Sequence, residues 1–194
     1  MKKLSNAKEV EIWSSWKTIK NKYQFGNDIL ESVVCHDEIT NIGEFAFAGC
    51  TNLTNIKMPQ KLKKIDRFAF NSCRSLETIE LPSTLTQIGE QAFVACTSLK
   101  SVTIPACIKK IEDFVFSRCS SLQSIIIPNT VTEIGIGAFD YCSSLEYLEI
   151  MNPNIKIHYS AFDGCDSLKK ITIPKELKDI QAFCEMQAIL NIVS

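Results

Sequence analysis

The chain has 194 residues, of which 45% are hydrophobic, and its 21 basic and 22 acidic side chains give a formal net charge of −1. This hydrophobic content is sufficient for a buried core and argues against a disordered chain. The near-zero charge provides no overall field that would attract nucleic acid or an anionic membrane, so neither partner is expected.

A period of 23 residues organises most of the sequence. Six cysteines follow one another at this step: Cys50, Cys73, Cys96, Cys119, Cys142 and Cys165. The same step relates columns of phenylalanine (Phe47, Phe70, Phe93, Phe116, Phe139, Phe162), leucine (Leu53, Leu76, Leu99, Leu122, Leu145, Leu168), isoleucine (Ile42, Ile65, Ile88, Ile111, Ile134, Ile157, Ile180) and proline (Pro59, Pro82, Pro105, Pro128, Pro174). Self-similarity at a fixed period indicates a solenoid of stacked coils.

Residues 1–28 are interpreted as a degenerate N-terminal coil or cap. Val10 and Ile19 stand one period before Val33 and Ile42. The first 16 residues lack the apolar run of roughly 7–15 residues that a secretory signal needs. The absence of a signal favours the cytoplasm. No stretch approaches the roughly 18–20 apolar residues of a membrane span, so no membrane insertion is expected.

Residues 29–180 form the regular repeats, as the unit LETIELPSTLTQIGEQAFVACTS from Leu76 illustrates. Its first part alternates apolar and polar residues and ends at proline, which predicts a short strand with one buried face. Ile88, Phe93 and Cys96 in its second part predict a tight helical or irregular return. Neighbouring coils are expected to pair their strands in parallel, at about 4.8 Å per coil.

Residues 181–194 are interpreted as an altered C-terminal coil. Deleting two residues after Ile180 aligns Phe183, Met186, Ile189 and Ile192 with the columns of the repeat. About eight coils without a linker then make residues 1–194 a single domain.

The repeat LxxIxIPxxVxxIGxxAFxxCxx, seen as LQSIIIPNTVTEIGIGAFDYCSS from Leu122, resembles the BspA-like leucine-rich repeats of bacteria and parasitic protists. The resemblance covers roughly residues 29–180. It implies a leucine-rich-repeat solenoid with a parallel β-sheet on its concave side and short helical or irregular returns on its convex side. It further implies no catalysis or cofactor, and adhesion to host or matrix proteins at a cell surface.

The cysteine column is predicted to consist of buried thiols. Adjacent coils place the Cα atoms about 5 Å apart, within reach of a disulfide, but side chains stacked in parallel fit its torsion poorly. The chain has no close C-x₂₋₄-C or H-x₃₋₅-H pair for zinc, and neither His36 nor His158 has an obvious catalytic partner. We therefore expect no catalytic, cofactor or metal site, and Cys107, in a corner, as the exposed thiol.

The residues between the buried strand positions provide a first candidate surface. On the concave side they include Lys57, Glu80, Ile126, Tyr147 and Glu149. Ile126 and Tyr147 would lie diagonally on adjacent coils and offer a small apolar anchor for a protein partner. The alternative is that they are scattered surface residues of no consequence.

A second candidate surface lies where Phe45, Phe68 and Phe114 occupy one column of the returns. Aromatic rows are enriched at interfaces, so this edge could pair with another copy, as could Ile189 and Ile192 in the last coil. Alternatively the rings fold back onto the solenoid as additional core. The sequence thus predicts a non-enzymatic protein-interaction module, with a self-assembling scaffold or homodimer as the alternative.

Overall fold

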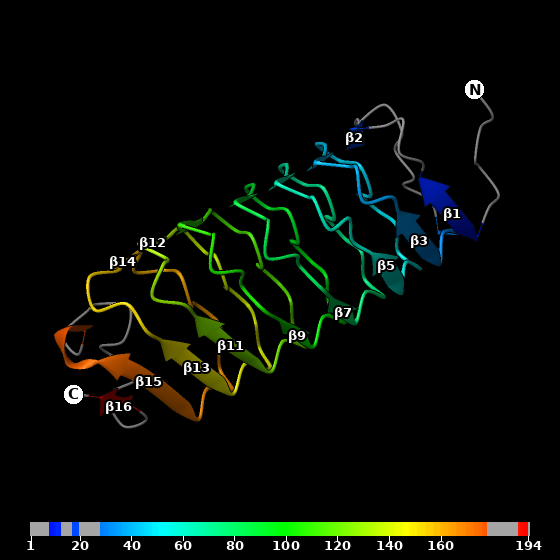
Figure 1. Cartoon of the computed structure of the whole chain (residues 1–194). Coiled ribbons are helices and arrows are strands. Elements are labelled where there is room, and N and C mark those ends of the chain that lie inside the picture. The colour runs from blue at the N-terminus through cyan, green and yellow to red at the C-terminus, as the bar shows by residue number, and fades with distance from the viewer. Residues whose placement is uncertain (1–7, 13–16, 20–27, 178–189, 194) are drawn as a thin grey trace.

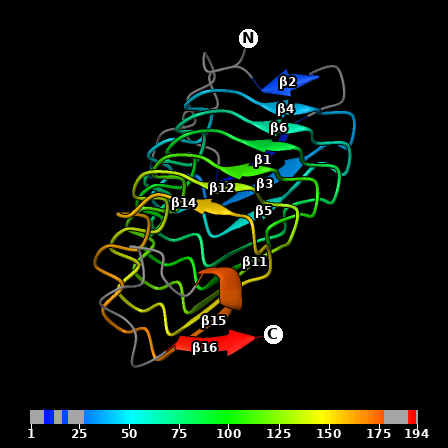
Figure 2. The ribbon, with the colours of Figure 1, turned by 90° about the vertical axis from the view of Figure 1, so that its left-hand side faces the viewer.

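The structure is a computed structural model that describes residues 8–12, 17–19, 28–177 and 190–193. The chain winds into a parallel β-solenoid, in which each coil from β1 to β14 contributes one strand to each of two faces (Figure 1). Figure 2 shows the coils stacked along one axis, with β2, β4 and β6 following one another on one face. The predicted parallel solenoid is therefore confirmed.

The long-strand face carries the strands that precede the proline column. Three of them form one sheet: β1 (Glu9–Ile12), β3 (Ser32–Cys35) and β5 (Asn55–Lys57). Six continue as a second sheet: β7 (Thr78–Ile79), β9 (Ser101–Val102), β11 (Ser124–Ile127), β13 (Tyr147–Ile150), β15 (Lys170–Pro174) and β16 (Leu190–Val193). Partners from β1 to β15 are 23 residues apart, as Val10 and Val33 are, which is the pairing expected from the repeat.

The short-strand face was not foreseen, because the isoleucine column had been assigned to the return. It consists of two-residue strands: β2 (Thr18–Ile19), β4 (Asn41–Ile42), β6 (Lys64–Ile65), β8 (Gln87–Ile88), β10 (Lys110–Ile111), β12 (Glu133–Ile134) and β14 (Lys156–Ile157). Each isoleucine of the first six strands is buried, and its polar neighbour points outward. A two-residue strand shows a single change from polar to apolar, too little for a period to be recognised.

The return segments run from the short-strand face back to the long-strand face, as residues 66–77 do between β6 and β7. They are built from turns, and within the described part of the chain the only helix is the 3₁₀ turn Lys175–Leu177. The irregular form of the predicted return is therefore the observed one. Two positions of each of the first five described returns are left-handed, including Phe68 (φ 57°) and Ser72 (φ 59°), and the sixth has one, Gly164 (φ 69°).

These left-handed positions let the returns hydrogen-bond to one another along the axis. The peptide N–H of Phe70 donates to the carbonyl of Ala92 on the next coil, and that of Ser72 donates to Val94, both at 2.8 Å. The carbonyl of Ala69 in turn accepts from Phe47 on the preceding coil at 2.8 Å. The returns therefore form a third hydrogen-bonded ladder beside the two faces.

The core lies between these three ladders. Phenylalanine rings from Phe47 to Phe162 form one continuous stack, with centroids of successive rings 5.2–5.5 Å apart. The rings repeat at the coil spacing, so each one covers the next and the stack excludes water from the axis. Buried side chains from Val10 to Leu177 belong to one cluster.

The prediction for the last coil was wrong in its register. Ile192 was expected opposite Ile171, but the structure pairs Leu190 with Ile171 and Ile192 with Ile173. These partners are 19 residues apart, whereas the predicted alignment separates partners by 21 residues and the regular coils by 23. The two registers differ by two residues, which is the period of side-chain alternation in a strand, so hydrophobic pattern alone could not separate them.

Candidate interaction surfaces

The long-strand face holds an ordered cluster around Tyr147. The Tyr147 hydroxyl donates a hydrogen bond to a carboxylate oxygen of Glu149 at 2.6 Å, and this bond raises the pKa of the phenol. The ammonium of Lys170, directly opposite Tyr147 on β15, lies 5.6 Å from the ring centre. Ile126 is 51% exposed and lies opposite Glu149 on β11. We call Ile126, Tyr147, Glu149 and Lys170 the tyrosine cluster.

The structure brings together three of the five residues predicted for this face. Lys57 in β5 and Glu80 after β7 are exposed on the same side, but they lie three and two coils away from Ile126. Lys170 was missed as a member of the site. Its position opposite an aromatic residue in the register was the available signal, because cross-strand neighbours are close enough for a cation to reach a ring.

The aromatic edge is only partly assembled. Phe45 and Phe68 are half-buried and stack on each other, with ring centroids 4.7 Å apart and planes 5° from parallel. Gln91 separates them from Phe114. The Phe114 ring occupies the space beside Gly137 that a side chain at position 137 would need. Phe45 and Phe68 thus form a pair and Phe114 lies apart. The side chains of Ile189 and Ile192 are outside the described residues.

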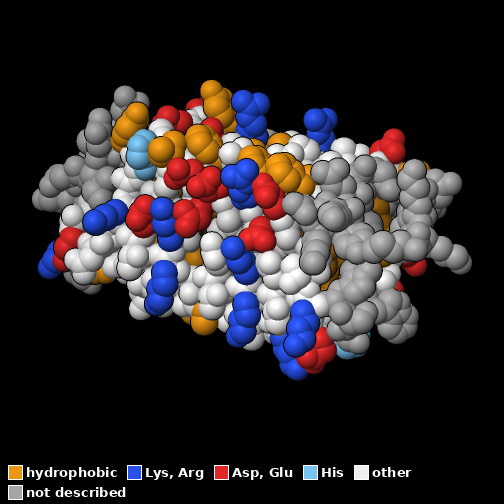
Figure 3. All heavy atoms as spheres, turned by 90° about the horizontal axis from the view of Figure 1, so that it is seen from above, with side chains coloured by type: hydrophobic (Ala, Val, Ile, Leu, Met, Phe, Trp, Pro, Cys, Tyr) orange, Lys and Arg blue, Asp and Glu red, His pale blue; other side chains and the backbone are white. Residues whose placement is uncertain are grey.

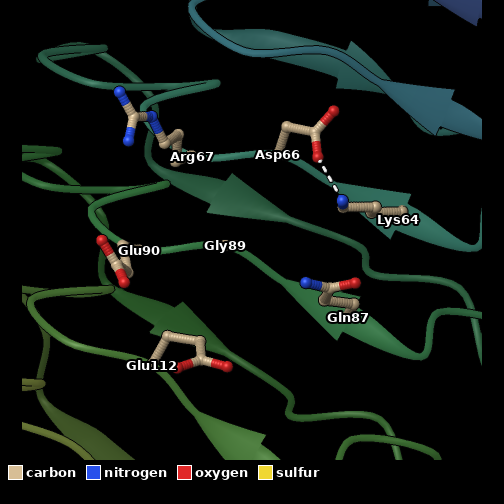
Figure 4. A pocket seen from close by; sticks show the side chains of 7 residues that line it. All are labelled: Lys64, Asp66, Arg67, Gln87, Gly89, Glu90 and Glu112. Carbon is tan, nitrogen blue, oxygen red and sulfur yellow. Dashed lines mark ion pairs between the residues drawn. The ribbon is translucent and has the colours of Figure 1, made fainter.

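A hollow on the short-strand face lies over Gly89. It is lined by Lys64, Asp66, Arg67, Gln87, Gly89, Glu90 and Glu112, shown in Figure 4. A Cβ at position 89 would stand 2.6 Å from the backbone nitrogen of Arg67, so only glycine fits there. Asp66 is already paired with Lys64 at 2.8 Å, and Glu112 with Lys110 at 3.0 Å.

Comparison with known families agrees with this architecture. The BspA type leucine-rich repeat region matches residues 17–146 and 65–191, in six copies. The chain belongs to this BspA-type leucine-rich-repeat family. Members of the family are repeat scaffolds that are generally non-enzymatic. No curated protein matches the chain significantly.

Solved structures of bacterial proteins, several of them named as leucine-rich repeat proteins, share the fold. The leucine-rich repeat protein of T. pallidum is 30% identical with a TM-score of 0.76, over 82% of this chain and 77% of that one. A leucine-rich repeat protein from Bacteroides ovatus is 22% identical (TM-score 0.54), over 95% of this chain and 69% of that one. The pneumococcal vaccine antigen PcpA is 15% identical (TM-score 0.50), over 97% and 79%.

The chain has two histidines. His36 is exposed, and His158 contacts the Ser160 hydroxyl through Nδ1 at 2.8 Å and the Tyr159 ring at 4.4 Å. Within the described residues, no group of three or more His, Cys, Asp or Glu side chains is placed to hold a metal ion. In the same part of the chain, no helix has the length and apolar character needed to cross a membrane.

Proposed function

We propose that this BspA-type chain is a non-enzymatic protein-binding module, and that it recognises a protein partner through the tyrosine cluster on its long-strand face. The carrying observation is an exposed isoleucine beside a tyrosine that is already fixed by Glu149 and Lys170. Lys57 and Glu80 extend this surface toward the N terminus as a polar margin. Adhesion to host or matrix proteins is the role that we propose for it.

The tyrosine cluster fits the chemistry of an interface centre. Aromatic side chains supply much of the binding energy in protein interfaces, and ordering them before binding reduces the entropy lost in the complex. The parallel strands beneath the cluster are joined to both neighbouring coils, so the surface is rigid. A partner with an apolar pocket and a cationic group near Glu149 would complement it.

The test is surface plasmon resonance against immobilised matrix proteins, such as collagen and laminin. Ile126→Glu should weaken binding by about 2 kcal/mol or more, roughly thirtyfold in Kd, because it puts a charge at the centre of the contact. Val34→Glu is the matched control, since Val34 is 41% exposed on the same face four coils away. Equal effects of the two variants, or no binding to any matrix protein, would contradict the proposal.

A second candidate function is self-assembly through the aromatic edge, and the parallel stack of Phe45 on Phe68 favours it. Two half-buried rings on a surface edge gain further burial if a second copy covers them. Light scattering coupled to size-exclusion chromatography, in reducing buffer over a wide concentration range, would detect this association. Phe68→Glu should shift a dimer toward monomer and Gln91→Glu, in the same column, should not; a monomer at every concentration would exclude this function.

A further inference from the structure

The short-strand face repeats every 46 residues rather than every 23. Coils that read Lys-Lys-Ile, at 63–65 and 109–111, alternate with coils that read Thr-x-Ile-Gly, at 40–43, 86–89 and 132–135. The two kinds of coil therefore place different side chains on this face. Every second coil offers lysines, and the coil between offers a threonine and a glycine.

The threonine side chains of these coils are hydrogen-bonded to backbone carbonyls of the preceding coil. Thr86 donates its hydroxyl hydrogen bond to the carbonyl of Lys63 at 3.0 Å, and Thr132 donates to that of Lys109 at 3.1 Å. Thr40 does the same to Lys17 at 3.1 Å. The lysine side chains are longer than these threonine side chains, so the neighbouring coils do not screen the lysine charges.

The outer lysines, Lys17, Lys63, Lys109 and Lys156, form a row with one member in every second coil. All four are exposed. Lys156 comes one residue later in its coil, at the strand position equivalent to Lys110 and directly opposite Glu133, because the position equivalent to Lys109 holds the buried Ile155. At about 4.8 Å per coil, neighbouring members of the row are roughly 10 Å apart along the axis.

The charges of this row are available to a ligand. Lys64 and Lys110, next to Lys63 and Lys109, are held in ion pairs by Asp66, Glu112 and Glu133. The outer lysines make no ion pair within the described part of the chain. Figure 3, which looks onto the short-strand face, shows basic side chains spread along its length beside a band of mixed charge. Asp66 and Glu112 follow their strands, on the side away from the outer lysines. Glu133 lies within a strand, and Glu38, which precedes β4, is paired with Lys61 and is near enough to Lys17 for the two charges to interact.

We propose that the row of outer lysines binds a linear acidic polysaccharide, laid along the solenoid axis. Such a polymer repeats its pattern of sulfate and carboxylate groups with each pair of sugars. A rigid row of cations about 10 Å apart can contact equivalent groups of successive sugar pairs. This site lies on a different face from the tyrosine cluster and is independent of the proposed function.

The residues between the outer lysines disfavour nucleic acid as the ligand. The spacing alone does not separate the two polymers, since phosphates in a DNA strand recur at about 3.4 Å and every third one could meet a lysine. Binding of single strands also relies on aromatic side chains between the cations, on which the bases stack. Threonine and glycine occupy the coils between the outer lysines instead.

The experiment measures binding of heparin, a sulfated polysaccharide, to the whole chain by calorimetry at several salt concentrations. Four contacts predict a slope of log K against log salt near −3, if each contributes about 0.7 as for single-stranded polyanions. Lys63→Gln/Lys109→Gln should reduce the slope to about half and weaken binding about tenfold or more. Lys100→Gln/Lys169→Gln removes the same charge from lysines paired with Glu77 and Glu146, and should leave both quantities unchanged.

Three outcomes would overturn the proposal. Absence of heparin binding at low salt would show that the site does not exist. Equal losses of heparin affinity in the two double variants would show a general electrostatic attraction that is not localised to the outer lysines. A single-stranded oligonucleotide that binds as tightly as heparin, with the same loss in Lys63→Gln/Lys109→Gln, would assign the row to nucleic acid. Because all four substitutions concern exposed side chains, circular dichroism should confirm an unchanged fold in each variant.

Discussion

The thiol of Cys96 donates a hydrogen bond to the carbonyl oxygen of Phe70, 26 residues earlier and one coil away, with Sγ 3.2 Å from the oxygen. Cys73, Cys119, Cys142 and Cys165 repeat the contact with Phe47, Phe93, Phe116 and Phe139 at 3.1–3.3 Å. The predicted buried thiols are confirmed, since none of these cysteines is in a disulfide. Cysteine suits the position because it is small and apolar, yet can satisfy a buried carbonyl.

Replacing Cys96 by alanine should destabilise the protein by about 1–2 kcal/mol. The substitution leaves a small cavity at a fully buried site and removes a weak donor from the Phe70 carbonyl. Urea unfolding followed by circular dichroism measures the change. Cys107→Ala is the control and should stay within about 0.5 kcal/mol, because Cys107 is exposed.

Stability should fall as the pH rises from about 9 toward 12. Burial raises the pKa of Cys35 and of Cys96 from 9.0 to about 12, so in this window the unfolded thiols lose protons while the folded ones keep them. Each such thiol then lowers the free energy of unfolding by about 1.4 kcal/mol per pH unit. Between pH 8 and pH 10, the free energy of unfolding should fall by less in Cys96→Ala than in the wild type. The two decreases should differ by about 1.4 kcal/mol. Identical losses would show that Cys96 does not resist ionisation.

Thiol reagents should distinguish Cys107 from the buried column. Cys107 is exposed, whereas desolvation raises the pKa of buried thiols such as Cys119 and suppresses their reactive thiolate. Under native conditions at pH 8, Cys107→Ser should therefore remove one equivalent from the fast phase of a disulfide-exchange reagent. Cys119→Ser should leave that phase unchanged, and a loss there would contradict the assignment of buried thiols.

Gly89→Ala should be among the most damaging small substitutions in the chain. Its Cβ would stand 2.6 Å from the Arg67 nitrogen and 2.8 Å from the Asp66 carbonyl carbon, so two coils must separate. We expect a loss of about 2–4 kcal/mol in thermal or urea unfolding. Gly49→Ala is the matched control: its φ is +74° but no atom lies within 4 Å of the added carbon, so it should lose only about 1 kcal/mol. A similar loss in both variants would contradict the clash.

The buried columns could be predicted because their signal is strong. Phe93, Cys96 and Leu99 recur with a fixed period, and every coil must bury the same positions against its neighbours. The left-handed positions could not be predicted in this way. A glycine would have indicated a turn, but residues such as Phe45 and Tyr141 occupy several of these positions. The alternation of apolar and polar residues was sufficient to predict on which face of the solenoid the tyrosine cluster lies. The contact between Tyr147 and Glu149 depends on side-chain conformation within one strand, which periodicity does not encode.

The hydrogen-bonded ladder formed by the return segments gives the molecule a net dipole along the solenoid axis. The peptide group between Ala69 and Phe70 turns its carbonyl toward the preceding coil and its N–H toward the following one, and its equivalents on other coils do the same. Their dipoles, about 3.5 D each, therefore add along the axis instead of cancelling as strand dipoles do. The positive end points toward the C-terminal coils, opposite to the sense of an α-helix, so each added coil lengthens a dipole that favours anions at the later end of the solenoid and cations at the earlier one.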